Sequence, residues 1–329
     1  MTATLLLFPG DPGDRQGHLG ATDIAALVCA RDGIATFAGA GAWKTWASQL
    51  HPELIAAPSP ETLARWALGH HLEPYVLHRL ETESEGLTVA PGGYVHSPAH
   101  PHIRAQLDGL ALVDGAIVGP ADAKTTEIPW EWYSWEREDG QWSRVEILPA
   151  GYVVQARIQL GLLRMACAVQ GLPLPTQAVY VGLDLTGAPM VPDGDGVRLD
   201  LDRAPLMVRW VDHNEDLFRD QYWYAVRWWD RYILGDEEPP DDDSDCCQRW
   251  RLYEQAHGYG ERPATPEESA LIAEWLALKE ANKTNEAERK TLQARILAGM
   301  DTPRLTLAGK QRVQLQLTGR NMTLRDYGF

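Results

Sequence analysis

The stretch HIRAQLDGLALVDGAIVGPADAKTT, residues 102–126, predicts two antiparallel strands joined by a tight turn. The turn is Asp114-Gly115, and an Asp-Gly pair between alternating apolar residues is the strongest short hairpin signal in a sequence. We expect one strand over residues 102–113 and the other over 116–126. The two strands are therefore neighbours in a sheet.

The register of this hairpin determines which side chains share a face of the sheet. In strict two-residue register Asp108 would lie opposite Ala121, and Asp122 would point to the other face. Gly119-Pro120 interrupts the second strand, and a β-bulge is expected there. One residue of slip then places Asp108 and Asp122 on one face, and Lys124 shares it because side chains alternate along a strand.

Helices are expected on either side of this hairpin. Pro60 and Glu61 begin a helical pattern in which apolar residues, Leu63 and Trp66 among them, recur over about five turns. Glu73 lies on or beside the apolar face of this helix, where a carboxylate is costly to bury unless a cation meets it. The remaining elements are a short helix near residues 22–28 capped by Thr22 or Asp23, helices over 151–171 and 213–234, and a strand over 176–185. This order indicates an α/β (α+β) class, with helices covering a central mixed β-sheet.

The chain divides into a core, residues 1–240, and a C-terminal extension, residues 241–329. The acidic run DEEPPDDDSD, residues 236–245, predicts a solvated linker, with mimicry of DNA as the less favoured alternative. Thr265-Pro266-Glu267-Glu268 then opens a long helix with a capping box, which extends to about residue 298. Residues 304–318 alternate as a closing β-hairpin.

Composition excludes several classes of protein. The net charge of −16 argues against a protein that coats nucleic acid through a basic surface, so any contact with DNA must be local. No apolar segment is long enough to cross a membrane and no secretory signal is present, so we expect a cytoplasmic protein. The cysteines are too irregularly spaced for a disulfide framework, a zinc site or an iron–sulfur cluster: Cys29, Cys167, Cys246 and Cys247.

The hairpin carries the residues that phosphodiester hydrolysis requires. Hard divalent cations such as Mg²⁺ bind converging oxygen ligands, and Asp108, Asp122 and the Ala123 carbonyl supply three of them. Lys124 is suited to orient or deprotonate the attacking water, and Glu73 can reach the metal from its helix. The alternative is an exposed strand salt bridge between Asp122 and Lys124. Small and apolar neighbours in QLDGLAL and GPADAKT favour the catalytic interpretation.

Four motifs in order resemble the PD-(D/E)xK nucleases, and within them the YqaJ-type viral recombinase group of phage lambda exonuclease. They are Glu73, HPHIRAQLDG with Asp108, DAKTT with Asp122 and Lys124, and YVVQARIQLGL with Tyr152, Gln155 and Gln159. The resemblance extends from about residue 15 to 239, and the helix and hairpin of 265–318 resemble the tail of longer members. One departure is Asp122 where the family usually has glutamate, so the carboxylate is set back from the metal by about the length of one carbon–carbon bond.

This resemblance implies a restriction-endonuclease-like core and a set of DNA contacts. Arg15 and Thr22 match the residues that hold a 5′-phosphate, for which an arginine and a hydroxyl at a helix N-terminus are chemically suited. Gln155 and Gln159 share a helix face with Tyr152 and are expected to touch the scissile phosphate or bases. A helix cap at Thr22 and a solvated polar stripe at the glutamines are the alternatives.

Two further groups of residues allow a functional interpretation. The tryptophans of residues 128–142 are Trp130, Trp132, Trp135 and Trp142. They suggest base stacking, but core packing is favoured for at least two of them. His70 and His71 lie close to Glu73 in sequence, and a helix-packing and surface pair is favoured over metal ligation.

The resemblance implies a 5′→3′ exonuclease on double-stranded DNA ends that leaves 3′ overhangs for recombination. It also implies Mg²⁺ as cofactor, replaceable by Mn²⁺, with two ions per site, and a phage or prophage origin in a bacterial cell. The expected partners are DNA ends, further copies of the chain in a ring-shaped trimer, and a single-strand annealing protein. A degenerate DNA-end-binding module, or an endonuclease or single-strand nuclease of the same fold, remains the alternative.

Overall fold

The computed structural model describes most of the chain, and it separates into two compact units, Met1–His257 and Gly258–Phe329. The described residues are 17–34, 41–127, 129–138, 141–193, 196–235, 237–242, 244–258, 304–306, 312–318 and 321–327. The division falls beyond the acidic run, so that nearly all of helix α6 (Asp245–Gly258) lies in the first unit.

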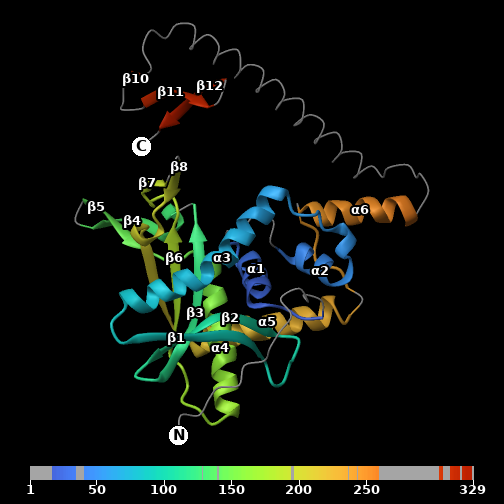
Figure 1. The fold of residues 1–329 in the computed structure, drawn as a ribbon. Helices are drawn as coiled ribbons and strands as arrows, with labels where there is room; N and C mark the ends of the chain where they lie inside the picture. Colours follow the sequence, from blue (N-terminus) through green and yellow to red (C-terminus); the bar gives the residue numbers. More distant parts are fainter. Residues whose placement is uncertain are drawn as a thin grey trace. The chain divides into compact units, whose positions relative to one another are not determined.

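A five-stranded mixed sheet forms the centre of the first unit (Figure 1). Its strand order is β1 (Leu87–His96), β2 (Arg104–Val113), β3 (Ala116–Thr126), β6 (Gln177–Asp184) and β9 (Leu206–Asp212). Strands β3 and β6 are parallel, and the other neighbours are antiparallel. Helices flank this sheet, so the predicted fold class is confirmed.

Helices cover both faces of the sheet, and the alternation along β6 shows how. Val179 and Val181 pack with α3 (Pro60–Glu83), whereas Ala178 and Tyr180 belong to a second cluster with α4 (Ala150–Val169). A third and larger cluster joins α4 to the remaining helices of this layer. These helices are α1 (Ala21–Arg31), α2 (Ala42–Leu50) and α5 (Glu215–Tyr232).

The β2–β3 hairpin has the slip that the sequence predicts. Val113 pairs with Ala116, but Ala111 pairs with Gly119, so one extra residue is accommodated between these pairs. The bulge lies beside Gly119, where a Cβ atom would come within 1.5 Å of the Gln177 carbonyl oxygen on β6. Glycine therefore permits the close approach of β3 to β6 at the point where the register changes.

Two details of the helices differ from expectation. Gly20 is the N-cap of α1, and Asp23, in the first turn, accepts a hydrogen bond from the Gly20 N–H, so Thr22 is not a cap. On α3 the predicted apolar stripe is only partly buried, because Leu63 and Trp66 are 50% and 55% exposed. The buried contacts of α3 come from its second half, through Leu72, Val76, Arg79 and Leu80.

The described part of the acidic run makes contacts with α2 and α6. Arg251 of α6 pairs with Glu238 at 2.7 Å and with Asp241 at 2.5 Å. The Trp43 indole N–H donates to the Pro240 carbonyl at 2.8 Å. The run lies between α5 and α6 in the sequence, and most of its described residues are exposed.

The small elements complete the described chain. The first unit also contains the 3₁₀ turns η1 (Pro52–Leu54), η2 (Pro129–Trp132) and η3 (Leu201–Arg203), and the hairpins β4 (Tyr133–Glu138) with β5 (Gln141–Glu146) and β7 (Met190–Asp193) with β8 (Gly196–Leu199). In the second unit, β10 (Arg304–Thr306), β11 (Arg312–Thr318) and β12 (Asn321–Tyr327) form an antiparallel sheet, so the expected hairpin gains a third strand. The helix expected over 265–298 lies outside the described residues.

No helix in the described ranges is long and apolar enough to span a membrane.

Candidate active site

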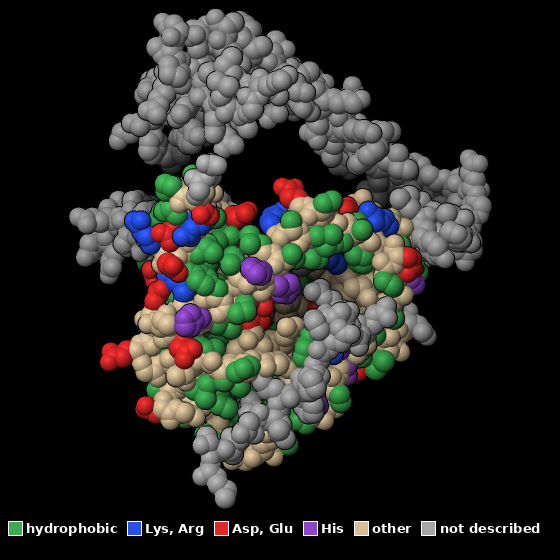
Figure 2. Space-filling view, in the orientation of Figure 1, with side chains coloured by type: hydrophobic (Ala, Val, Ile, Leu, Met, Phe, Trp, Pro, Cys, Tyr) green, Lys and Arg blue, Asp and Glu red, His purple; other side chains and the backbone are tan. Residues whose placement is uncertain are grey.

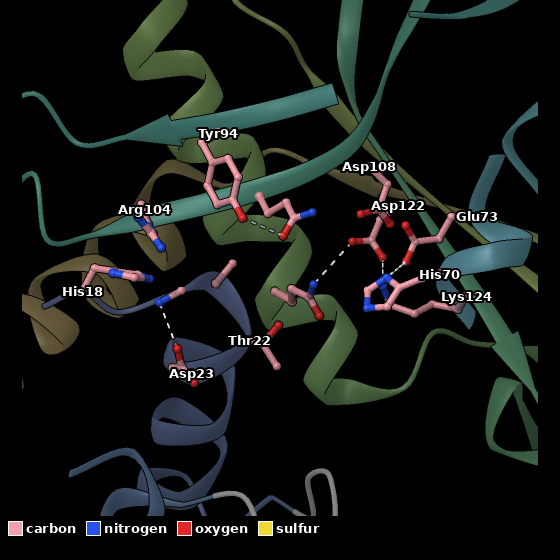
Figure 3. A pocket seen from close by; sticks show the side chains of 14 residues that line it. His18, Thr22, Asp23, His70, Glu73, Tyr94, Arg104, Asp108, Asp122 and Lys124 are labelled. Atoms are coloured by element: carbon pink, nitrogen blue, oxygen red, sulfur yellow. Dashed lines mark hydrogen bonds and ion pairs between the residues drawn. The ribbon is translucent and has the colours of Figure 1, made fainter. Parts of the chain in front are cut away.

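One pocket brings together residues from α1, α3, α4 and the β1–β3 part of the sheet. The predicted site residues that line it are Thr22, Glu73, Asp108, Asp122, Lys124 and Gln155. Acidic and histidine side chains lie beside a hollow on the face drawn in Figure 2. In Figure 3, Glu73, Asp108, Asp122 and Lys124 gather at one end of the pocket, while His18 and Arg104 lie at the other.

The two aspartates converge where β2 and β3 stop pairing. The last pair of the ladder is Gly109 with Ala121, and continuing this register places Asp108 opposite Asp122. Beyond that pair β2 remains bonded to β1 while β3 remains bonded to β6, so the two strands separate. The Asp108 carboxylate lies in this fork and accepts a hydrogen bond from the Ala123 N–H at 3.0 Å.

Lys124, also on β3, faces the fork in which the two aspartates converge. Its ammonium group forms an ion pair with the Asp122 carboxylate and lies 3.3 Å from the Ala123 carbonyl oxygen. The Lys124 side chain is 23% exposed, and the rings of Tyr152 and Tyr180 lie 5.7 and 5.6 Å from its nitrogen. Burial lowers the pKa of Lys124, but the carboxylates of Asp122 and Asp108 outweigh this effect and raise it above its usual value.

Negative charge is in excess at this end of the pocket. Burial, followed by the charge of Asp122, raises the pKa of Asp108 to about 7, and Glu73 adds to this rise. Lys124 and the Ala123 N–H oppose it without cancelling it. A raised carboxyl pKa means that nearby positive charge does not fully offset the negative charge of the ionised carboxylate. This site therefore favours an additional cation.

Glu73 reaches the pocket from α3, as the sequence predicts. Its side chain is 30% exposed and shares a 2.8 Å hydrogen bond with the imidazole Nδ1 of His70. His70 also lines the pocket, so the structure adds it to the site, whereas His71 is exposed and is not a lining residue. The sequence signal for His70 is its position three residues before Glu73, which places both side chains on one helix face.

The polar residues of α4 lie at different depths. Gln155 lines the pocket, and its amide Nε2 lies 3.4 Å from Asp122. Gln159 is 1% exposed, does not line the pocket, and donates to Asp122 at 2.9 Å. Tyr152 does not line the pocket either; it packs against Trp132 and Tyr180. Trp132 is 2% exposed and therefore part of the core, and the side chains of Trp130, Trp135 and Trp142 lie outside the described residues.

The opposite end of the pocket is formed by the start of α1 and by β1 and β2. Thr22 is exposed in the first turn of α1, and His18 and Arg104 line the pocket beside it. The Arg104 guanidinium lies 5.1 Å from the centroid of the Tyr94 ring. The sequence analysis missed Arg104, although it precedes Asp108 by four residues on one strand, a spacing that places side chains on a common face. Arg15 lies outside the described residues.

Cation-binding capacity rests on a small number of oxygen atoms. Asp108 and Asp122 contribute carboxylates at the fork, and the Ala123 carbonyl lies beside them. Within the described ranges, no three His, Cys, Asp or Glu side chains form a ready cluster for a metal ion. A cation here would therefore depend on a main-chain oxygen, on solvent or substrate, or on a movement of Glu73.

Comparisons with known proteins return structural neighbours but no sequence relatives. No family model matches the chain, and no curated protein matches its sequence. One similar structure is an alkaline exonuclease (LHK-Exo) from Laribacter hongkongensis, at 16% identity, with 72% of this chain and 94% of that chain covered and a TM-score of 0.41. Another is LHK-Exo in complex with dAMP, at 18% identity, with 66% and 89% covered and a TM-score of 0.42.

Proposed function

We propose that this chain is a metal-dependent deoxyribonuclease that degrades double-stranded DNA from its ends. The observation that carries the proposal is the convergence of Asp108, Asp122 and Lys124 in the fork between β2 and β3. Two carboxylates and one lysine, held together in a pocket open to solvent, match the needs of phosphodiester hydrolysis.

The donor set fits a hard divalent cation. Asp108, Asp122 and the Ala123 carbonyl are the oxygen ligands we assign to one Mg²⁺ ion, with Mn²⁺ as a substitute and Glu73 extending the site to a second. The pKa of Asp108, raised to about 7, supports this assignment because a bound cation would offset the charge that burial and Asp122 make costly. When bound, such ions supply Lewis-acid stabilisation of the phosphate and activation of water.

Lys124 is the residue we assign to the attacking water. Its ammonium group contacts Asp122 and lies near the Ala123 carbonyl, so it faces the same point as the proposed ligands. Because its raised pKa keeps it protonated at neutral pH, Lys124 is suited to orient water and to stabilise charge on the phosphate. Gln155, beside Asp122, would contact the scissile phosphate or hold this aspartate.

The far end of the pocket is suited to a terminal phosphate. The N-terminus of α1 carries partial positive charge, and the hydroxyl of Thr22 and the guanidinium of Arg104 lie in the same pocket. Arg15 is proposed as a further ligand. Local cationic groups of this kind allow a chain of net charge −16 to bind one end of DNA. A 5′-phosphate held there favours 5′→3′ degradation that leaves 3′ overhangs.

The alternative functions differ in whether the site cuts nucleic acid and in which substrate it cuts. A degenerate module would bind DNA ends without cleavage, but it would not need the acid-rich fork and Lys124 together. An endonuclease or single-strand nuclease would use the same residues on another substrate. A ring-shaped homo-oligomer, a single-strand annealing partner and a role in phage-type recombination are further proposals that rest on the resemblance of the sequence motifs.

An assay with end-labelled duplexes separates these functions. Linear DNA labelled at the 5′ end or at the 3′ end is incubated with the full chain, with Mg²⁺ or with a chelator. We expect mononucleotides from the 5′-labelled strand at early times, intact 3′ label, and no products with chelator. Early loss of the 3′ label would contradict the direction, internal fragments would indicate an endonuclease, and no Mg²⁺-dependent products would support a binding module.

A further inference from the structure

Gln159 occupies the fork that β2 and β3 leave open. Its amide Nε2 donates to the Gln106 carbonyl oxygen on β2 at 3.0 Å and to the Asp122 carboxylate on β3 at 2.9 Å. It therefore bridges the two strands beyond the last ladder pair, at one residue past Ala121 on β3 and three residues before Gly109 on β2. At 1% exposure, Gln159 presents almost no surface to a DNA substrate.

The orientation of this amide is determined by its three partners. A main-chain carbonyl and an ionised carboxylate only accept hydrogen bonds, so the –NH₂ end must face Gln106 and Asp122. The opposite end, Oε1, accepts from the Tyr180 hydroxyl at 2.7 Å. Tyr180 is completely buried and lies beside Asp122 in the parallel β3–β6 register. Burial raises the pKa of Tyr180 well above its ordinary value, which keeps the hydroxyl protonated and able to donate.

We infer that Tyr180 and Gln159 are positioning residues that hold the Asp122 carboxylate ready for a divalent cation. Tyr180 acts through Gln159, and Gln159 acts through Asp122. The inference rests on the proposed metal site. It assigns Gln159 to the support of a metal ligand rather than to DNA contact, and it assigns a function to Tyr180, which no sequence motif singled out.

The physical basis is the preorganisation of a metal ligand by its hydrogen-bond partners. If the Tyr180 hydroxyl is removed, Oε1 of Gln159 is left buried without that donor, which costs free energy. The amide lowers this cost by turning toward other hydrogen-bonding groups. Asp122 then loses its 2.9 Å donor, while Lys124 still attracts the same carboxylate. Of the amide donors in the described part of the chain, only Gln155, at 3.4 Å, then remains near that carboxylate oxygen, so Asp122 is held less firmly at the metal position. Loss of such an outer partner typically weakens metal affinity by roughly 10–100-fold.

The test measures Mn²⁺ binding by the full chain without DNA, using calorimetry or the electron paramagnetic resonance signal of free Mn²⁺. We expect Tyr180→Phe to weaken Mn²⁺ binding by roughly ten-fold. Cleavage by this variant should recover at saturating Mn²⁺, with an unchanged KM for DNA. The matched control is Tyr222→Phe, because the buried Tyr222 hydroxyl bonds Ser97 at 2.5 Å and His100 at 2.6 Å outside the pocket. The control should bind Mn²⁺ as the wild type does.

A double-mutant cycle tests the order of action. Gln159→Met preserves length without the amide, so it should weaken Mn²⁺ binding at least as much as Tyr180→Phe. Adding Tyr180→Phe to Gln159→Met should then have no further effect, because residues that act through one another are not additive. Equal Mn²⁺ affinity in wild type and Tyr180→Phe, or a raised KM for DNA with unchanged Mn²⁺ affinity, would overturn the inference.

The two proposals fail in different ways. A wild-type chain that binds Mn²⁺ but cuts no DNA would overturn the nuclease and leave the positioning of Asp122 intact. Normal cleavage together with unaltered Mn²⁺ affinity in both variants would overturn the positioning alone. Independent effects of the two substitutions would show that Tyr180 does not act through Gln159.

Discussion

The Asp108 carboxylate accepts a hydrogen bond from the Ala123 N–H at 3.0 Å, although the two residues lie on strands that have stopped pairing. A backbone group that the ladder no longer satisfies is thus bonded by a side chain of the neighbouring strand. This contact fixes Asp108 beside Asp122 and turns the fork into a site with converging carboxylates.

Asp108→Asn and Asp122→Asn are each expected to abolish Mg²⁺-dependent cleavage and to weaken metal binding. Each substitution replaces a charged oxygen ligand by a neutral one. Asp108→Asn should also raise the melting temperature without metal at pH 8, because burial and Asp122 make the ionised form of Asp108 costly. Calorimetry and thermal unfolding measure both effects, with the exposed Asp193→Asn as control. Unchanged metal affinity in either site variant would remove that aspartate from the ligand set.

Glu73→Gln is expected to reduce cleavage strongly while changing the free energy of unfolding little. The Glu73 side chain lines the pocket but is 30% exposed, so loss of its charge costs little packing. If its role is to extend the site to a second ion, the number of Mn²⁺ ions bound should fall from two to one. A variant with full activity and unchanged Mn²⁺ stoichiometry would show that only Asp108 and Asp122 are needed.

A duplex with a 5′-phosphate should be degraded faster than one with a 5′-hydroxyl. Thr22 and Arg104 line the end of the pocket where α1 begins, and a helix N-terminus favours an anion. Thr22→Val, Arg104→Gln and Arg15→Ala should each reduce this preference, and the rate on the 5′-hydroxyl duplex serves as the internal control. Equal rates of the wild type on both duplexes would mean that these residues bind something else.

Gly92→Ala is expected to lower the melting temperature and to weaken metal binding together. A Cβ atom at Gly92 would come within 1.9 Å of the Leu107 carbonyl oxygen and 2.6 Å of the Asp108 carbonyl carbon. Strand β2 must therefore move at the position that holds Asp108. Gly69→Ala is the matched control, because its Cβ atom would meet only Thr125, at 3.7 Å. Wild-type Mn²⁺ affinity in Gly92→Ala would mean that Asp108 tolerates this displacement.

Local signals predicted the centre of the fold and of the site. Asp114-Gly115 specified the hairpin. The interruption expected at Gly119-Pro120 occurs one residue earlier, at Val118, and produces the slip that aligns Asp108 with Asp122. These inferences succeeded because turn chemistry and side-chain alternation depend on residues close in sequence.

Long-range geometry lay beyond the sequence. The separation of β2 from β3 depends on the pairing of each with a different third strand, and the burial of Gln159 follows from that separation. The exposure of Trp66 depends on how far α3 extends past its buried contacts, which helical periodicity does not determine. Likewise, Arg104 joins the pocket only because α1 begins beside β2.

Cleavage by Lys124→Ala tests the central claim most directly. Linear 5′-phosphorylated duplex is incubated with wild type, Lys124→Ala and the exposed control Lys44→Ala, each with Mg²⁺ and with chelator. The account predicts Mg²⁺-dependent degradation by wild type and by the control, and a loss of about 10²-fold or more in Lys124→Ala, with its thermal unfolding still cooperative. Undiminished Mg²⁺-dependent cleavage by a folded Lys124→Ala variant would contradict the proposed active site.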